Sequence, residues 1–180
     1  MLNEVKKIDF DSVALIKTKD IRFEPSLIEL CEKNSCGNYN TNWTCPPLVG
    51  DTPELVKKIK QYENAVIFQK IYHLEDSFDY EGMTAGQQNF RELCENLHTE
   101  CKNESGDFLL LSAGGCRLCD RCAALDNLPC VNPEAAFSSL EAYGIQVSTL
   151  AELCGMKYIN GANTVTYFGG VFFESRGNNL

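Results

Sequence analysis

The stretch NAVIFQKIYHL (Asn64–Leu74) gives the strongest strand signal in this 180-residue chain. β-Branched and aromatic side chains dominate it, and such residues are enriched in strands. The preceding segment, DTPELVKKIKQYE (Asp51–Glu63), begins with Thr52 and Pro53, which is typical of a helix N-terminus. Its apolar side chains form an inward stripe made of Leu55, Val56, Ile59 and Tyr62. The centre of the chain is therefore predicted to be a helix followed by a buried strand.

Three further strands are predicted on the two sides of this centre. They are SVALIKT (Ser12–Thr18), DFLLLSAGG (Asp107–Gly115) and NTVTYFGGVFF (Asn163–Phe173). In the last of these, Gly169 and Gly170 allow a bulge or a close approach of two backbones. Helices are predicted at Pro25–Lys33, at 84–101, at Asn132–Gly144 with Gly144 as its C-cap, and at Ser148–Gly155 with Ser148 as its N-cap.

About four strands interleaved with helices predict a layered domain with a mixed sheet, of the α+β or the α/β class. We favour α+β, with residues 1–180 as a single domain. A ferredoxin-like, split βαβ arrangement is the preferred architecture. Two cysteine-rich loops, at 31–47 and 114–133, are predicted to be attached to this domain.

Composition indicates a reducing compartment. Hydrophobic residues make up 44% of the chain and charged residues 23%, so a core can form without crosslinks. The N-terminal segment lacks the apolar region of a secretory signal, and no run approaches the roughly 18 apolar residues of a membrane helix. We therefore expect a cytoplasmic protein with no membrane partner. In that setting its ten cysteines point to metal ligands or redox chemistry more than to disulfides.

The charge pattern argues against nucleic acid as a partner. The formal net charge is −9, whereas phosphate binding needs a concentrated basic surface. Lys57, Lys58 and Lys60 cluster only on the exposed side of a predicted helix. The chain also lacks a Walker loop, a dinucleotide-binding glycine motif, a nucleophile elbow and an H-E-x-x-H helix. No independent catalytic motif is present, and whether the protein is an enzyme stays open.

The segment GGCRLCDRCAALDNLPC (Gly114–Cys130) carries the strongest functional signal. Its cysteines follow the spacing C-x2-C-x2-C-x7-C and are Cys116, Cys119, Cys122 and Cys130. Two intervening residues let successive thiolates converge on one inorganic core, as in bacterial ferredoxin loops. Zinc ribbons more often use two separate C-x2-C pairs. We therefore predict a 4Fe-4S cluster here, with zinc as the alternative. Arg117 and Arg121 either offset its charge, dock an acidic partner or are simply solvated.

The second cysteine motif, CEKNSCGNYNTNWTCPP, places Cys31, Cys36 and Cys45 in a loop rich in asparagine and proline. Three ligands are one short of a closed four-coordinate site. The fourth is expected from Cys154, His73, His98, a carboxylate such as Asp51, or an exogenous molecule. The last of these would leave an open metal, whereas another alternative is that both motifs complete one shared zinc or cluster site. Tyr39 and Trp43 are expected to shield the metal from water, or to stack on a substrate.

The remaining cysteines and the histidines have ordinary structural explanations. Cys94 and Cys101 recur with Phe90, Leu93 and Leu97 at helical spacing, and a buried thiol behaves as a small apolar group. His73 lies on the strong strand and His98 on this helix.

Taken together, these motifs resemble a prokaryotic family of predicted metal-binding proteins, domain of unknown function 2284. The resemblance rests on the Cys31, Cys36, Cys45-Pro46-Pro47 loop with Trp43, on GGCRLCDRC with the following PC, on SLEAYGIQV and on NTVTYFGG, and it covers nearly the whole chain. It implies two metal-binding motifs and a cytoplasmic prokaryotic protein, but no particular reaction.

The sequence thus predicts an iron-sulfur protein with one 4Fe-4S cluster, or two if the first loop also binds one. Electron transfer to a redox partner protein, or reductive activation of a partner, is the expected function. The alternatives are a zinc-binding structural or interaction module without redox activity, and a small enzyme that uses the open metal.

Overall fold

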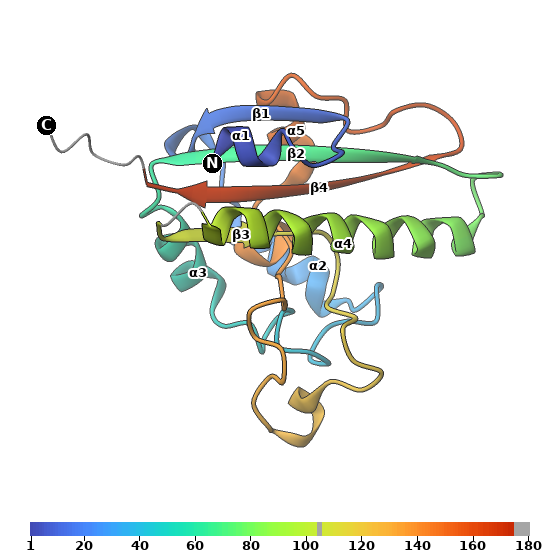
Figure 1. Ribbon diagram of the computed structural model, residues 1–180. Coiled ribbons are helices and arrows are strands. Elements are labelled where there is room, and N and C mark those ends of the chain that lie inside the picture. The colour runs from blue at the N-terminus through green and yellow to red at the C-terminus, as the bar shows by residue number, and fades with distance from the viewer. Residues whose placement is uncertain (104–105, 175–180) are drawn as a thin grey trace, which may run out of the picture.

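The predicted central strand lies inside a four-stranded sheet. A computed structural model describes residues 1–103 and 106–174 and contains strands in the order β1-β2-β4-β3 (Figure 1). They are β1 (Ser12–Lys17), β2 (Asn64–His73), β3 (Phe108–Leu111) and β4 (Thr164–Phe173). Residues 64–69 of β2 are all buried, because both faces of the sheet are covered at this point. The predicted α+β class with about four strands is confirmed.

The strand directions differ from the mixed sheet that the sequence led us to expect. The pairings β1 with β2, β2 with β4 and β3 with β4 are all antiparallel. Hydrophobic patterns mark where a strand lies but carry no information about its direction, which explains the difference. Since β2 and β3 are both antiparallel to β4, they run parallel to each other on its two sides. They are joined through α4 (Tyr80–Asn103), so β2–α4–β3 is a split βαβ unit. The wider ferredoxin-like arrangement stays a prediction.

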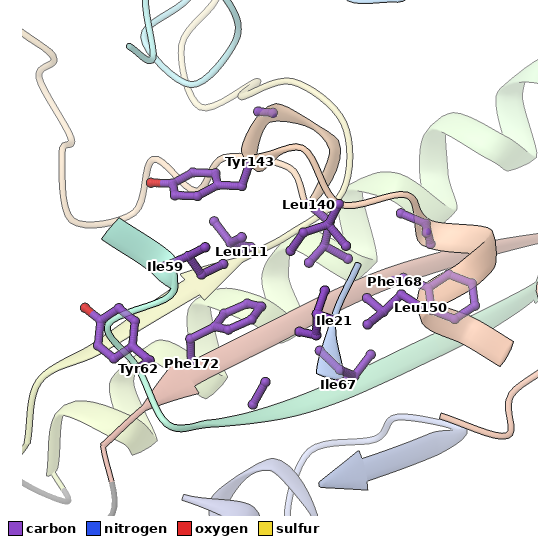
Figure 2. Close-up of a cluster of buried hydrophobic side chains, with 14 of the residues drawn as sticks. Ile21, Ile59, Tyr62, Ile67, Leu111, Leu140, Tyr143, Leu150, Phe168 and Phe172 are labelled. Carbon is purple, nitrogen blue, oxygen red and sulfur yellow. The ribbon is translucent and has the colours of Figure 1, made fainter. Parts of the chain in front are cut away.

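Two layers of helices cover the sheet. α1 (Leu2–Val5) and α4 pack on one face, where Phe68 and Phe90 are fully buried. The other face is covered by α3 (Thr52–Ile59), α5 (Val147–Leu153) and the short turn η4 (Glu141–Tyr143), whose side chains meet those of β2 and β4 (Figure 2). The remaining helical elements are η1 (Thr18–Asp20), η2 (Pro25–Leu27), α2 (Ile28–Glu32) and η3 (Ala123–Asp126). Both cores therefore lie directly against the sheet.

The helix predicted at Asn132–Gly144 does not form, apart from the single turn η4. Instead, Ser112 at the end of β3 donates its backbone N–H to the Ser138 carbonyl at 2.8 Å, and Ser112 forms a parallel bridge with Ser139. This long-range pairing holds the segment extended and overrides its local helix propensity. The prediction of Ser148 as an N-cap is also wrong, because α5 begins one residue earlier, with Gln146 at the N-cap.

Gly169 makes a close backbone approach rather than a bulge. It pairs with Phe68 in a continuous register, and a Cβ added there would lie 2.5 Å from Phe68 Cε2 and 2.8 Å from the Leu111 carbonyl oxygen. We expect Gly169→Ala to lower the free energy of unfolding by about 3 kcal/mol, the upper range for overpacking. Gly170→Ala is the matched control with a smaller loss, because its added Cβ meets only side-chain atoms. Urea denaturation of both variants measures this, and equal losses would contradict the assignment.

Candidate metal centre

Two loops contain the predicted ligands, and both lie beyond the β3 edge of the sheet (Figure 1). The first loop (residues 31–47) begins within α2, and the second loop (residues 114–133) follows β3 and contains η3. Gly114, at the start of the second loop, has a φ of +72°, a left-handed conformation that glycine adopts without strain. The chain therefore turns sharply from the sheet into its cysteine cluster.

The second loop brings its four cysteines around one space. Cys116, Cys119, Cys122 and Cys130 line a small cavity of about 20 Å³, together with Leu118, Ala123, Val131 and Asn132. We call this cavity the second hollow. It has room for about one small atom, since a water molecule needs roughly 10–15 Å³ on the same measure. The four thiols of the motif therefore lie around one space.

The environment of the second hollow disfavours the thiolate form of Cys116 in the absence of a cation. Burial raises the pKa of Cys116, and a backbone hydrogen bond involving Leu118 partly offsets this. Negative charge on Cys130, Cys119 and Cys122 would raise the pKa further. A metal centre would supply the compensating positive charge. The donor set therefore suits a cation that binds sulfur.

The three cysteines of the first loop line a separate and larger space. Cys31, Cys36 and Cys45 face a cavity of about 310 Å³, which we call the first hollow. Cys45 is buried and Cys36 is exposed. Burial raises the pKa of Cys31 and of Cys45, and hydrogen bonds from Asn42 and Thr44 partly offset the effect at Cys45. Each motif therefore has its own hollow.

The predicted protein candidates for a fourth ligand lie elsewhere in the described chain. Cys154 is the C-cap residue of α5 and packs against the core, and the centroid of the His98 ring lies 5.5 Å from that of Phe108 and 5.3 Å from that of Phe137. His73 ends β2, and Asp51 is the N-cap residue of α3. Among the residues that the structure describes, none of these four lines the first hollow. Its cysteine set therefore stays at three.

Cys94 and Cys101 are core residues, as their helical spacing predicted. Both are buried in α4 against the sheet. Burial raises the pKa of Cys94 to about 12, and Ser112 hydrogen-bonds to its sulfur at 3.4 Å. No disulfide links the cysteines of the described chain. These two thiols are separate from both hollows.

The two loops are fastened to each other. Thr44 Oγ1 accepts the backbone N–H of Cys116 at 3.1 Å and donates to Asn42 Oδ1 at 2.8 Å. Trp43 Nε1 donates to the Leu128 carbonyl at 3.0 Å. Thr44 and Asn42 are both buried, which shields the hydrogen bond between them from water, whereas the Trp43 bond is exposed. The first loop therefore fixes the backbone at the first cysteine of the second.

Sequence reasoning missed Asn42 and Thr44 as site residues. The sequence feature that could have indicated them is two small polar residues within three positions of Cys45. Buried polar side chains usually form hydrogen bonds, often with backbone groups. Trp43 was expected to shield a metal or stack on a substrate, but it reaches across to the second loop. Tyr39 does line the first hollow. The aromatic residues of the motif thus have separate roles.

Thr44→Val should weaken metal binding in the second loop. The variant leaves the buried N–H of Cys116 without its acceptor, which costs about 1–3 kcal/mol of stability. Metal affinity at the second loop should fall about 10- to 100-fold, as is typical when a residue that positions a ligand is lost. Chelator competition measures the affinity. Thr41→Val is the control, because Thr41 donates to Asn38 within the first loop; equal losses in the two variants would contradict the role of Thr44.

The charged residues near the hollows differ in their bonding. Arg121 forms an ion pair with Asp126, with Nη2 2.7 Å from Oδ1, and the two side chains are solvated. Arg117 is exposed and forms no hydrogen bond or ion pair within the described residues. Glu141 lines the first hollow. Desolvation of its carboxyl by the surrounding protein raises the pKa of this group, although part of the residue is exposed. Arg121 is therefore neutralised locally, whereas Arg117 is not.

The thiols do not yet stand in ligating positions. Within residues 1–103 and 106–174, no group of three or more His, Cys, Asp or Glu side chains has the geometry to hold a metal ion. Metal binding therefore requires the cysteine side chains to rearrange. The assignment of Cys31, Cys36, Cys45, Cys116, Cys119, Cys122 and Cys130 as ligands stays a prediction.

Comparison with known proteins gives one match. The family described as "Predicted metal-binding protein (DUF2284)" matches residues 14–173. This range contains both cysteine loops and all four strands apart from the first two residues of β1. No curated protein and no solved structure matches the chain. In addition, none of the helices among the described residues is long and apolar enough to cross a membrane.

Proposed function

Because the chain belongs to this family of predicted metal-binding proteins, we propose that its two cysteine loops bind metal and that the second loop holds a 4Fe-4S cluster. The observation that carries the proposal is the set of four thiols around the second hollow. Their C-x2-C-x2-C spacing is the ferredoxin pattern. Such a cluster exchanges single electrons with a partner. We propose electron transfer, or reductive activation of a partner protein, in a reducing cytoplasmic setting.

The chain's own residues support this role in two ways. The hydrogen bond from Cys116 N–H to Thr44 holds the loop backbone in place, which limits its rearrangement when charge changes. Val131, which lines the second hollow, and Leu125 and Leu128 of the same loop are exposed apolar side chains, with exposed fractions of 67%, 45% and 57%. Exposed apolar patches mark interaction sites. A redox partner could therefore dock close to the four cysteines.

Zinc is the second candidate, and one observation favours it. The second hollow, at about 20 Å³, has room for a single ion before the loop adjusts, whereas a four-iron cluster requires the loop to open outward. Four thiolates also form a closed tetrahedral zinc site. In that case the protein would be a structural or interaction module without redox activity.

Anaerobic purification followed by metal and sulfide analysis separates the two candidates. Iron and acid-labile sulfide in about equal amounts, with broad visible absorption, support the cluster. A colourless protein with stoichiometric zinc and no sulfide would contradict the iron-sulfur proposal. Metal content below one atom per chain, in protein that remains folded, would contradict both.

Replacing Cys154, His73 and His98 together should leave the metal content of the first loop unchanged. None of these residues lines the first hollow in the described chain, so none is placed to complete its ligand set. Cys36→Ser is the comparison variant and should lose metal there. Metal analysis and the absorption spectrum of both proteins provide the measurement. If the triple variant loses metal from the first loop, one of the three replaced residues is the fourth ligand, which would contradict this prediction.

A further inference from the structure

The first hollow has the size and walls of a small-molecule site. Its volume of about 310 Å³ is far more than a metal ion needs and lies at the lower end for ligand pockets. Leu27, Leu30, Tyr39 and Pro46 supply apolar wall. Leu30 is 58% exposed, so part of this apolar wall is accessible from solvent. The hollow is therefore suited to a mainly apolar molecule of modest size.

The charges around the first hollow are of one sign. Glu141 is the one carboxylate on its lining, and no lysine or arginine of the described chain lines it. Within the described residues Glu141 forms no ion pair, although Ser139 hydrogen-bonds to its side chain, and both Glu141 and Glu32 are close enough to act on the Cys31 thiol. Three thiolates around a centre of charge 2+ would add a net charge of −1. This side of the cavity therefore favours a cation over an anion.

From these observations we infer that the first hollow binds a small organic molecule that combines an apolar body with a primary ammonium group. The apolar body lies against Leu27, Leu30 and Tyr39, and the ammonium faces Glu141 beside the cysteines. This inference deepens the proposed function and rests on it, because part of the negative charge comes from the metal-bound thiolates. The inference also explains why the proposed metal site of the first loop has three cysteines and faces a cavity, with no fourth side chain of the described residues lining it as a ligand.

Three probes of similar size test the inference on the metal-loaded full chain. They are benzylamine, benzyl alcohol and benzoate, which share a phenyl ring and differ in charge. Isothermal titration calorimetry should show saturable binding in the order amine, alcohol, acid. Glu141→Gln should weaken benzylamine binding about fivefold, as expected for a partly exposed ion pair, and leave benzyl alcohol unchanged. Glu29→Gln is the control, since Glu29 belongs to α2 but does not line the hollow.

A second variant tests the apolar wall. Leu27→Ala should weaken the binding of amine and alcohol alike, because it shortens the wall without changing charge. Equal binding of benzoate and benzylamine, or no saturable binding of any probe, would overturn the inference. Metal content is measured on the same samples. A chain with full metal content and no preference for the amine contradicts this inference alone, whereas absence of metal from the first loop contradicts the proposed function as well.

Discussion

Cys119→Ser is expected to remove the metal centre of the second loop. Cys119 has no role in either buried core, but it is one of the four thiols that line the second hollow. A serine hydroxyl is a poor ligand for iron-sulfur clusters and for zinc, which both prefer thiolate. We expect metal affinity at this loop to fall by more than about 100-fold, beyond the range for residues that only support a ligand. Metal and sulfide analysis of the anaerobically purified variant provides the measurement.

The matched control for this variant is Cys94→Ala. Cys94 is fully buried in α4, so its replacement should lower the free energy of unfolding by about 1 kcal/mol for the lost burial. Its metal content should equal that of the parent protein, because Cys94 lines neither hollow. The two variants therefore separate loss of metal from loss of stability. Full metal content in Cys119→Ser would remove Cys119 from the ligand set.

Metal removal is expected to release both loops and to leave the sheet folded. The two buried cores lie against β2, β3 and β4 and contain none of the four cysteines of the second loop. A chain of this size buries enough apolar surface to fold without a metal, unlike a zinc finger. After chelation, amide hydrogen exchange in residues 31–47 and 114–133 should speed up roughly 100-fold, while β2 and β4 keep their protection.

The far-UV circular dichroism spectrum is the companion measurement. It should change little after chelation, because helices α3, α4 and α5 are held in the two buried cores against the sheet, although α4 also contacts the start of the second loop. Complete unfolding on metal removal would show that the cores depend on the metal. Unchanged exchange in the loops would show that hydrogen bonds such as Thr44 with Cys116 order them without metal.

The two central strands could be predicted because each one carries a run of buried residues that includes apolar side chains at the centre of the sheet. Thus β2 and β4 lie within one residue of their predicted ranges at both ends. The segment 132–144 could not be predicted in the same way. Its composition favours a helix, whereas its structure is decided by pairing with Ser112 at the end of β3. The residues of this segment alone do not indicate that it pairs with a residue so far away in the sequence.

The candidate site likewise has features that the sequence predicts and features that it does not. Cysteine spacing grouped the thiols that line each hollow, since the cysteines of each set are neighbours along the chain, whereas their role as metal ligands stays a prediction. The hydrogen bond between the two loops could not be predicted, because Thr44 and Cys116 are 72 residues apart and neither residue type indicates the other as its partner. The separation of Cys154 and His98 from the first hollow likewise follows from how α5 and α4 pack. Tertiary packing decides which candidate ligands can meet.

The position of Trp43 gives this protein a built-in optical reporter. It is the single tryptophan of the chain, and its indole N–H is anchored on Leu128 in the opposite loop. Any movement that parts the two loops must break this bond and expose the ring to water. The emission wavelength of the unlabelled protein will therefore follow the opening and closing of its cysteine loops in real time.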